Sequence, residues 1–417
     1  MKKERIVVGL SGGVDSSVAA WVLKQQGYEV VGVYMINWKD TVGTLSGECP
    51  YEDDMLVAEL VARKLDIEFH VVDLSDTYKD RVVEYLFSEY EKGRTPNPDV
   101  LCNREIKFDA FIQAAARLGA NTVATGHYCR RDIAEGVTVP SQAVTSGKAG
   151  SQGEADAPGK PLYRLLAGLD PNKDQSYFLC QLSQQQLAAA LFPVGDLNKG
   201  EVRRIATELG LATAQKKDSQ GICFVGKVDL PVFLQQKLDK KQGHVVEIPS
   251  DLKAYSRLIP EALDERLRKQ ARPYYYRLKD GKIVGQHQGA HFYTIGQRKG
   301  LGIGGHEHPL FVLATDIEAN LIFVGEGEQH PGLYRKSLKI NNEEVHWVRP
   351  DKTLSVGESA SYQVRIRYRQ PLQQAILYQL EDGLYIDFDT PQQSVTAGQF
   401  AVWYDGDELV GSGPISE

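Results

Sequence analysis

The 417-residue sequence contains no apolar run that approaches the ~18 residues needed to cross a bilayer. It also shows no signal peptide, because the charged stretch Met1–Arg5 leads directly into an apolar strand rather than into an h-region with a cleavage site. These two absences argue against a membrane or secreted protein. We therefore expect a cytoplasmic protein that does not engage a membrane.

Cysteine is scarce and scattered. The five cysteines at positions 49, 102, 129, 180 and 223 form no C-x-x-C pair, which argues against a disulfide scaffold in a cytosolic protein. Each thiol is then either a small core residue or a reactive group. His287 and His291 have a zinc-like spacing, but no cysteine lies near them, so we interpret them as structural and predict no metal site in the protein itself. The net charge of −7 does not indicate a nucleic-acid binder, although local basic patches decide phosphate affinity.

Two common phosphate-binding motifs are missing as well. The sequence lacks G-x-x-x-x-G-K-[ST], which excludes a Walker A loop. It also lacks G-x-G-x-x-G after its first apolar run, which argues against a dinucleotide-binding fingerprint. Instead, the apolar run Ile6–Val8 predicts a buried strand, Ser11–Gly13 a small-residue loop, and Ser16–Gln26 a helix. Backbone N–H groups at such a strand–loop–helix junction bind anions, and glycine lets the ligand approach closely. An ordinary glycine-rich turn is the alternative.

The length and the pattern predict three domains. Strands alternate with amphipathic helices over the first ~130 residues, which predicts an α/β domain with a doubly wound parallel sheet over 1–228. A Gly/Ser/Ala-rich mobile insertion is expected at 136–160. A small central α+β domain is expected over 229–306, with a polar helix near 259–270. The remainder, 307–417, predicts a C-terminal β-barrel or sandwich with strands at 310–315, 321–324, 360–368, 374–380, 385–388 and 400–404.

Two cysteines stand in unusual surroundings. We expect Pro96 and Pro98 to keep the stretch 97–103 out of a helix and to rigidify it as a loop. Cys102 then stands before a helix that begins at Lys107, where the helix end, Arg104 and Lys107 would favour its thiolate. A surface loop with an incidental cysteine is the alternative. Cys223 lies in a short apolar run, 221–225, and by itself reads as a buried strand residue.

The sequence motifs resemble a known family when they are read together. The loop Gly9–Ser17 resembles the PP-loop of the N-type ATP pyrophosphatases, which transfer AMP to a carbonyl-type oxygen. The full set resembles the tRNA-specific 2-thiouridylases, in order over nearly the whole chain. The set consists of Gly-Leu-Ser-Gly-Gly-Val-Asp-Ser-Ser (9–17), Asn-Pro-Asp-Val-Leu-Cys-Asn (97–103), Thr-Gly-His-Tyr (125–128), Lys-Asp-Gln-Ser-Tyr-Phe-Leu (173–179), Asp-Ser-Gln-Gly-Ile-Cys-Phe (218–224), the Gly-rich stretch 293–305, and Arg-Tyr-Arg (367–369). Two stretches, about 136–160 and 250–276, are longer than is usual in that family.

The resemblance implies an activity and assigns residues to it. It implies adenylation of the C2 oxygen of the wobble uridine (position 34) of tRNA, followed by its replacement with sulfur carried as a persulfide on Cys223. Cys102 is implied as the second catalytic thiol, which either releases sulfide or forms a disulfide with Cys223, and Asp99 as a general acid/base. ATP with Mg²⁺ is the implied cofactor, Asp15 being the nearest carboxylate. The implied ATP site comprises Gly9, Leu10, Ser11, Gly12, Gly13, Val14, Asp15, Ser16, Met35 and Gly126.

The resemblance also implies contacts with the substrate. Those to the target base and the tRNA are Asn97, Pro98, Asp99, His127, Lys173, Asp174, Gln175, Tyr368, Arg369 and Gln399. The implied partners are tRNA of the Lys, Glu and Gln type and a sulfur donor, which is a cysteine desulfurase or a sulfur-relay protein. No oligomer is implied, and a monomer is expected.

Basic residues give independent but local support for RNA binding. Strand alternation predicts that Arg365, Arg367 and Arg369 share one face, flanked by Tyr362 and Tyr368, which would suit phosphates and stacked bases. A solvated strand face is the alternative. The basic turn 296–300 adds two further cations. The competing hypotheses for the whole chain are another PP-loop ligase with a non-tRNA substrate and a non-catalytic RNA-binding module.

Overall fold

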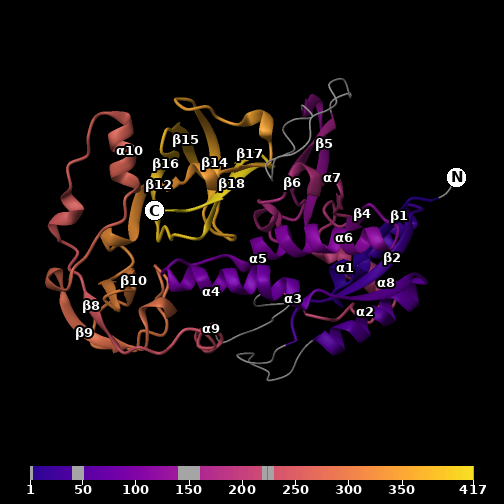
Figure 1. Ribbon diagram of the computed structural model, residues 1–417, viewed down its shortest axis with the longest axis horizontal. Coiled ribbons are helices and arrows are strands. Elements are labelled where there is room, and N and C mark those ends of the chain that lie inside the picture. The colour runs from indigo at the N-terminus through magenta and orange to yellow at the C-terminus, as the bar shows by residue number, and fades with distance from the viewer. Residues whose placement is uncertain (1–2, 40–50, 140–159, 218–222, 224–229, 417) are drawn as a thin grey trace.

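The N-terminal half of the protein is built on a parallel sheet. The computed structural model describes residues 3–39, 51–139, 160–217, 223 and 230–416 (Figure 1). Five parallel strands form the sheet in the order β3-β2-β1-β4-β7. Their bounds are Arg5–Gly9 (β1), Glu29–Ile36 (β2), Glu68–Asp73 (β3), Thr122–Ala124 (β4) and Ala190–Leu191 (β7).

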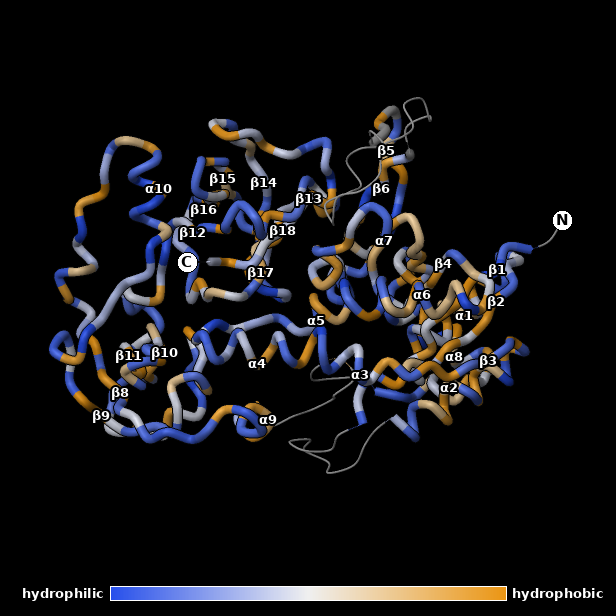
Figure 2. The backbone as a smooth tube through the Cα atoms, viewed as in Figure 1, coloured by the Kyte–Doolittle hydropathy of each residue, from blue (hydrophilic) through white to orange (hydrophobic). Residues whose placement is uncertain are grey.

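Helices cover both faces of this sheet, which confirms the predicted doubly wound architecture. In β1, Ile6 and Val8 pack in one buried cluster and Val7 in another, as the two-residue alternation of a strand requires. The first cluster includes residues of α1 (Val14–Gln25), α2 (Tyr51–Leu65) and α8 (Lys199–Glu208). The second includes residues of α4 (Glu84–Glu91) and α6 (Phe111–Arg117). Figure 2 shows hydrophobic stretches along the backbone of the strands and helices of this domain.

The stretch that contains Cys102 is helical. Pro98 begins α5 (Pro98–Leu101), and the Asn97 side chain caps it by accepting a hydrogen bond from the backbone N–H of Val100 at 3.3 Å. The helix continues through a π-helix, Cys102–Ala110, into α6. The predicted loop is therefore wrong, because proline is tolerated in a first helical turn, where its missing N–H has no intrahelical partner to lose.

The middle of the chain forms a second, mixed sheet in the order β10-β11-β8-β9. Its strands are Gly243–Glu247 (β8), Lys282–His287 (β9), Leu310–Asp316 (β10) and Leu321–Glu326 (β11). The strands predicted at 310–315 and 321–324 therefore belong to this sheet and not to the C-terminal one, because β11 pairs in parallel with β8. The predicted polar helix is present as α10 (Leu263–Ala271). The structural interpretation of His287 is confirmed, since its ring bonds to backbone groups of Gly289 and Asn320.

The C-terminal antiparallel sheet extends into the N-terminal region. It comprises β12 (Tyr334–Ile340), β13 (His346–Trp347), β14 (Ser359–Arg365), β15 (Gln373–Leu380), β16 (Gly383–Gln393), β17 (Phe400–Asp405) and β18 (Glu408–Pro414). The hairpin β5 (Cys129–Val139) and β6 (Lys160–Ala167) joins it, because Leu165 of β6 pairs with Leu409 of β18. The predicted insertion lies outside the described residues except at its ends, where these two strands pair.

Shorter helices complete the described fold: α3 (Ser75–Tyr78), α7 (Gln184–Ala188), α9 (Leu230–Leu234), the π-helix Lys79–Val83, and short 3₁₀ turns such as Ser176–Leu179. The strand predicted at 221–225 lies outside the described residues apart from Cys223, which sits in a turn. Among the helices that the structure describes, none combines the length and apolarity that a bilayer crossing requires.

Candidate active site

The PP-loop wraps around the N-terminus of α1. Gly12 adopts a φ of +70°, and a Cβ there would collide with the carbonyl of Asp54, so only glycine fits. The Ser16 hydroxyl accepts a hydrogen bond from the backbone N–H of Ser11 at 3.2 Å and donates one to the Gly13 carbonyl at 3.1 Å. These bonds fold the loop around the first turn of the helix, which is the geometry of an anion site.

Other residues predicted for nucleotide binding gather at this loop. Met35 packs on Gly9, since a Cβ at Gly9 would lie 3.2 Å from the Met35 methyl carbon. A Cβ at Gly126 would lie 2.6 Å from the backbone nitrogen of Ser16. The loop, the end of β2 and the turn after β4 thus meet at the carboxyl edge of the parallel sheet, where ligands of such sheets bind.

Two lysines from distant parts of the chain supply positive charge here. Lys199 Nζ contacts both carboxylate oxygens of Asp15, at 2.7 and 2.8 Å, and the Tyr128 hydroxyl donates to the same carboxylate at 2.6 Å. Lys216 Nζ donates to the Gly12 carbonyl at 3.0 Å and pairs with Asp54. A magnesium ion would have to displace Lys199 to reach Asp15, and the described residues contain no cluster of three metal-ligating side chains. The residues therefore do not fit a magnesium site in this arrangement.

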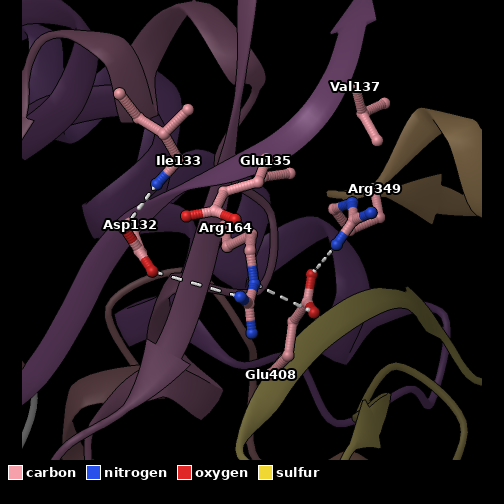
Figure 3. A pocket seen from close by; sticks show the side chains of 8 residues that line it. Asp132, Ile133, Glu135, Val137, Arg164, Arg349 and Glu408 are labelled. Carbon is pink, nitrogen blue, oxygen red and sulfur yellow. Dashed lines mark hydrogen bonds and ion pairs between the residues drawn. The ribbon is translucent and has the colours of Figure 1, made fainter.

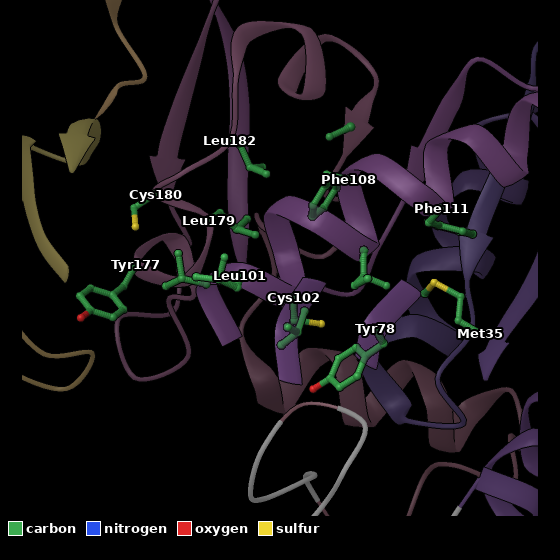
Figure 4. Packing of buried hydrophobic residues seen from close by; sticks show 14 of the residues in the cluster. Met35, Tyr78, Leu101, Cys102, Phe108, Phe111, Tyr177, Leu179, Cys180 and Leu182 are labelled. Atoms are coloured by element: carbon green, nitrogen blue, oxygen red, sulfur yellow. The ribbon is translucent and has the colours of Figure 1, made fainter. Parts of the chain in front are cut away.

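Cys102 and Cys223 come together although 121 positions separate them. The backbone N–H of Cys223 donates to Asp99 Oδ1 at 3.0 Å, and the Tyr78 hydroxyl donates to the Cys223 carbonyl at 2.7 Å. The Cys102 thiol donates a hydrogen bond to the Cys223 sulfur. Figure 4 shows Cys102 beside Tyr78 in the buried cluster. The three residues predicted to be catalytic therefore share one site.

The two thiols differ in acidity. Burial raises the pKa of Cys102 well above its usual value, so the prediction that its thiolate is favoured is wrong. The hydrogen bond from Cys102, with the positive charge of Lys107, lowers the pKa of Cys223 to about 7. Burial also raises the pKa of Asp99, although the Cys223 N–H and Lys107 oppose that shift. Arg104, the other cation near Cys102 in sequence, bonds instead to Glu105 and Gln181.

The turn that follows β4 connects the PP-loop to the cysteines. Gly126 packs on the first turn of α1, and Tyr128 bonds to Asp15. Between them, His127 Nε2 lies 3.5 Å from Lys107 Nζ, and its Nδ1 lies 2.7 Å from Thr125 Oγ1. The turn thus contacts the PP-loop through Gly126 and Tyr128, and it contacts Lys107 through His127.

Several residues predicted to contact tRNA bind other parts of the protein. Asp174 is 7% exposed, and its carboxylate accepts bonds from Ser176 N–H and from Arg365, both at 3.0 Å. Gln175 bonds to the backbone of Tyr128 in both directions. The Gln399 amide donates to the carbonyl of Thr95 at 2.9 Å, just before the helix that carries Cys102.

The remaining tRNA candidates are more open to solvent. Tyr368 packs on Phe178 with ring centroids 4.3 Å apart, and Arg369 is exposed. Lys173 is partly buried, whereas Asn97 and Pro98 form the start of α5. The structure leaves the assignment of these residues to tRNA as a prediction.

The three arginines do not share a strand face. β14 ends at Arg365, which lies inward against Asp174 and over the ring of Tyr404 at 4.6 Å, so the alternation stops before Arg367. Arg367 donates to the Ser394 carbonyl at 2.7 Å. A Cβ at Gly296 would lie 3.6 Å from its guanidinium, which places the basic turn 296–300 beside it. The basic surface therefore comes from two domains and not from one strand.

A cavity of about 430 Å³ lies elsewhere, between the hairpin β5–β6 and the C-terminal sheet (Figure 3). Glu408 in its wall pairs with Arg349 and lies 3.2 Å from Arg164. None of the predicted site residues lines this cavity.

Sequence reasoning missed Tyr78, Lys199 and Lys216 as members of the site. Each acts on a residue more than 140 positions away, so no local spacing reveals it. Lys199 does follow the helix cap Asn198, which forms a capping box with Glu201. A capping box locates the N-terminus of a helix, but it does not reveal that Lys199 pairs with Asp15.

Comparisons with known proteins identify the family of the chain. Three family models match: a tRNA methyl transferase HUP domain over residues 4–227, a tRNA methyl transferase PRC-barrel domain over 261–326, and an aminomethyltransferase β-barrel domain over 337–415. Proteins named tRNA-specific 2-thiouridylase MnmA from Christiangramia forsetii and Flavobacterium johnsoniae are 54% and 55% identical, each over 99% of this chain and 100% of the relative. A 4-thiouridine synthetase–RNA complex with bound ATP is a distant structural likeness, at 18% identity and a TM-score of 0.33 over 56% of this chain and 50% of that one. The chain therefore belongs to the tRNA-specific 2-thiouridylase family.

Proposed function

We propose that this protein is a tRNA-uridine 2-sulfurtransferase that replaces the C2 oxygen of uridine 34 with sulfur at the expense of ATP. The observation that carries the proposal is the convergence of Cys102, Cys223 and Asp99 beside Lys107, which contacts His127 in the same turn whose residues Gly126 and Tyr128 contact the PP-loop. A nucleotide phosphate at the PP-loop and a sulfur at the cysteines would then both reach the C2 position of the same uridine. A PP-loop ligase that uses an amine nucleophile would not need the pair of thiols.

The reaction divides into activation and sulfur transfer. The C2 oxygen attacks the α-phosphorus of ATP and pyrophosphate leaves, so the oxygen becomes part of a good leaving group. Backbone N–H groups of the PP-loop and the N-terminus of α1 stabilise the phosphate charge. Lys199 and Lys216 lie within the same site and add positive charge.

Sulfur transfer uses the difference between the thiols. Because Cys223 is the more acidic, its thiolate is the sulfur that accepts the sulfane sulfur of the donor as a persulfide. The terminal sulfur attacks C2, and AMP leaves with the oxygen. Cys102 then attacks the Cys223 sulfur and forms a disulfide with it. Oxidation of the two thiols to this disulfide supplies the two electrons that reduce the sulfane sulfur to the sulfur of the thiocarbonyl group. In the other order, Cys102 attacks first and frees hydrosulfide, which attacks C2.

The resting structure suits either order. The hydrogen bond between the two cysteines keeps their sulfurs within reach of a disulfide, which a dithiol reductant must open before the next cycle. Asp99 is nearby to accept or return a proton. The target base must be unstacked to enter a site this enclosed, at a cost of a few kcal/mol.

Cofactor and partners follow from the same proposal. ATP binds at the PP-loop, and Mg²⁺ is expected to travel with its phosphates and water, since Asp15 is already paired with Lys199. The substrate is tRNA of the Lys, Glu or Gln type. The sulfur donor is a cysteine desulfurase or a relay protein, and the protein works in the cytoplasm as a monomer.

The deciding experiment is mass analysis of uridine 34 in unmodified tRNA(Lys) after incubation with the protein, Mg-ATP and a persulfide source. We expect 2-thiouridine with the unaltered protein and none with Cys223→Ser or Cys102→Ser. Formation of AMP with an amine acceptor and no thiolated nucleoside would instead indicate another PP-loop ligase. RNA binding without any RNA-dependent pyrophosphate release would indicate a binding module.

A further inference from the structure

We propose that Lys107 is a further catalytic residue, whose ammonium group is the counter-ion of the sulfur carried on Cys223, with His127 as the residue that positions it. This inference rests on the proposed sulfur transfer, because it concerns the atom that would carry the sulfur. It differs from the sequence expectation, which connected Lys107 with the thiolate of Cys102.

The π-helix brings Lys107 to the cysteines. In an α-helix, a residue five positions beyond Cys102 would point about 140° away around the helix axis, since each residue turns by about 100°. The π-helix Cys102–Ala110 closes its hydrogen bonds between residues five apart, so Lys107 lies roughly one turn above Cys102 on the same side. A single π-helical segment thus places a thiol and an ammonium group on one face.

Contacts around the ammonium group are consistent with this role. Lys107 hydrogen-bonds to the Cys223 sulfur, and its Nζ lies 3.5 Å from Nε2 of His127. His127 is 7% exposed, and burial, followed by the charge of Lys107, lowers its pKa well below the usual value, so the ring is neutral and can accept from Lys107. Its Nδ1–H then donates to Thr125 Oγ1.

Among the groups that shift the pKa of Cys223 most strongly, Lys107 is the cation. Asp99 and Cys102 face Cys223 from the same helix, and Tyr78 faces it from α3. None of these three can carry positive charge. Burial alone would lower the pKa of Lys107, but the sulfurs of Cys223 and Cys102 and the Asp99 carboxyl outweigh it and raise it, so the ammonium form persists.

The role of Lys107 can be tested without tRNA or ATP. The rate at which iodoacetamide alkylates Cys223 is measured against pH by mass spectrometry of the full-length protein. We expect a midpoint near pH 7 with the unaltered protein and an upward shift of roughly 1–3 units in Lys107→Met, because the favourable charge is removed. Lys107→Arg, which keeps the charge, should shift the midpoint less. The matched control is Lys92→Met, which removes an exposed lysine paired with Glu89 and should shift nothing.

A second readout connects the effect to turnover. Thiolation by Lys107→Met should fall at least tenfold at pH 7 and recover as the pH rises toward 9, a recovery that a merely structural defect would not show. An unshifted alkylation profile in Lys107→Met would overturn the inference. If that variant does not fold, Lys107→Gln supplies the same comparison. Failure of thiolation in the unaltered protein, with the alkylation shift present, would reject the proposed function and with it the catalytic role, and would leave only the charge interaction between Lys107 and the Cys223 thiolate.

Discussion

Replacing Asp174 with alanine should destabilise the protein rather than weaken tRNA binding alone. The carboxylate is 7% exposed and holds Arg365 at 3.0 Å, and the Arg365 side chain is 12% exposed. It also accepts bonds from the backbone N–H groups of Gly168, at 3.2 Å, and Ser176, at 3.0 Å. Its removal leaves a largely buried guanidinium without its counter-ion, a loss that typically costs about 3–5 kcal/mol.

The assay is thermal unfolding of the full-length protein followed by tRNA binding. At roughly 2–4 °C per kcal/mol, the midpoint should fall on the order of 10 °C. The control is Asp196→Ala, because the Asp196 side chain is 82% exposed and 3.9 Å from Arg130, and should change stability by less than about 0.5 kcal/mol. The double replacement Asp174→Leu with Arg365→Met should recover part of the loss, since neither partner is then left charged and buried.

One result would refute this reasoning. If Asp174→Ala unfolds at the same temperature as Asp196→Ala but binds tRNA much more weakly, its carboxylate acts on the RNA and not on Arg365. The prediction taken from the family resemblance, that Asp174 contacts tRNA, would then stand.

Three further outcomes are expected. Thiolation should decline as the pH falls through about 7, because the pKa of Cys223 is lowered to about 7 and its thiolate is lost below that value; a flat pH–rate profile would contradict this. Burial raises the pKa of Cys102, so its thiol should not react with iodoacetamide at pH 7. Gly126→Ala should abolish tRNA-dependent pyrophosphate release, since the added Cβ would lie 2.6 Å from the backbone of α1; unchanged release would show that the turn can move. Gln399→Ala should lower the thiolation rate several-fold and the free energy of unfolding by only about 1–2 kcal/mol, because the carbonyl of Thr95 before α5 loses its hydrogen bond. Single-turnover assays measure the rate and calorimetry measures the stability, and an unchanged rate would remove Gln399 from the site.

The parallel sheet and the PP-loop could be predicted because their signals are local. A β-branched run, a glycine loop and an amphipathic helix stand next to one another, and the structure contains all three. The loop predicted around Cys102 is wrong because proline breaks a helix only in its interior, whereas Pro98 occupies a first helical turn, where proline is favourable.

The arginine prediction failed for a different reason. Alternation assumes that a strand continues, but β14 ends at Arg365, and the buried Asp174 that attracts this arginine is 191 positions away. Lys199 was missed in the same way, because it meets Asp15 only after the sheet has formed. Residues that complete a site through tertiary contact leave no pattern in a single sequence.

The pairing of β6 with β18 has a consequence for dividing this chain. A fragment that ends near residue 228 would keep the hairpin β5–β6 but lose β18, the strand that pairs with β6. It would therefore expose backbone hydrogen-bonding groups along β6. A separate C-terminal fragment would carry the complementary open edge at Leu409. The family models divide the chain into three sequence segments, yet the first and the last share one hydrogen-bonded sheet. Gene fragments cut between them should aggregate when expressed singly and recover solubility when they are produced together.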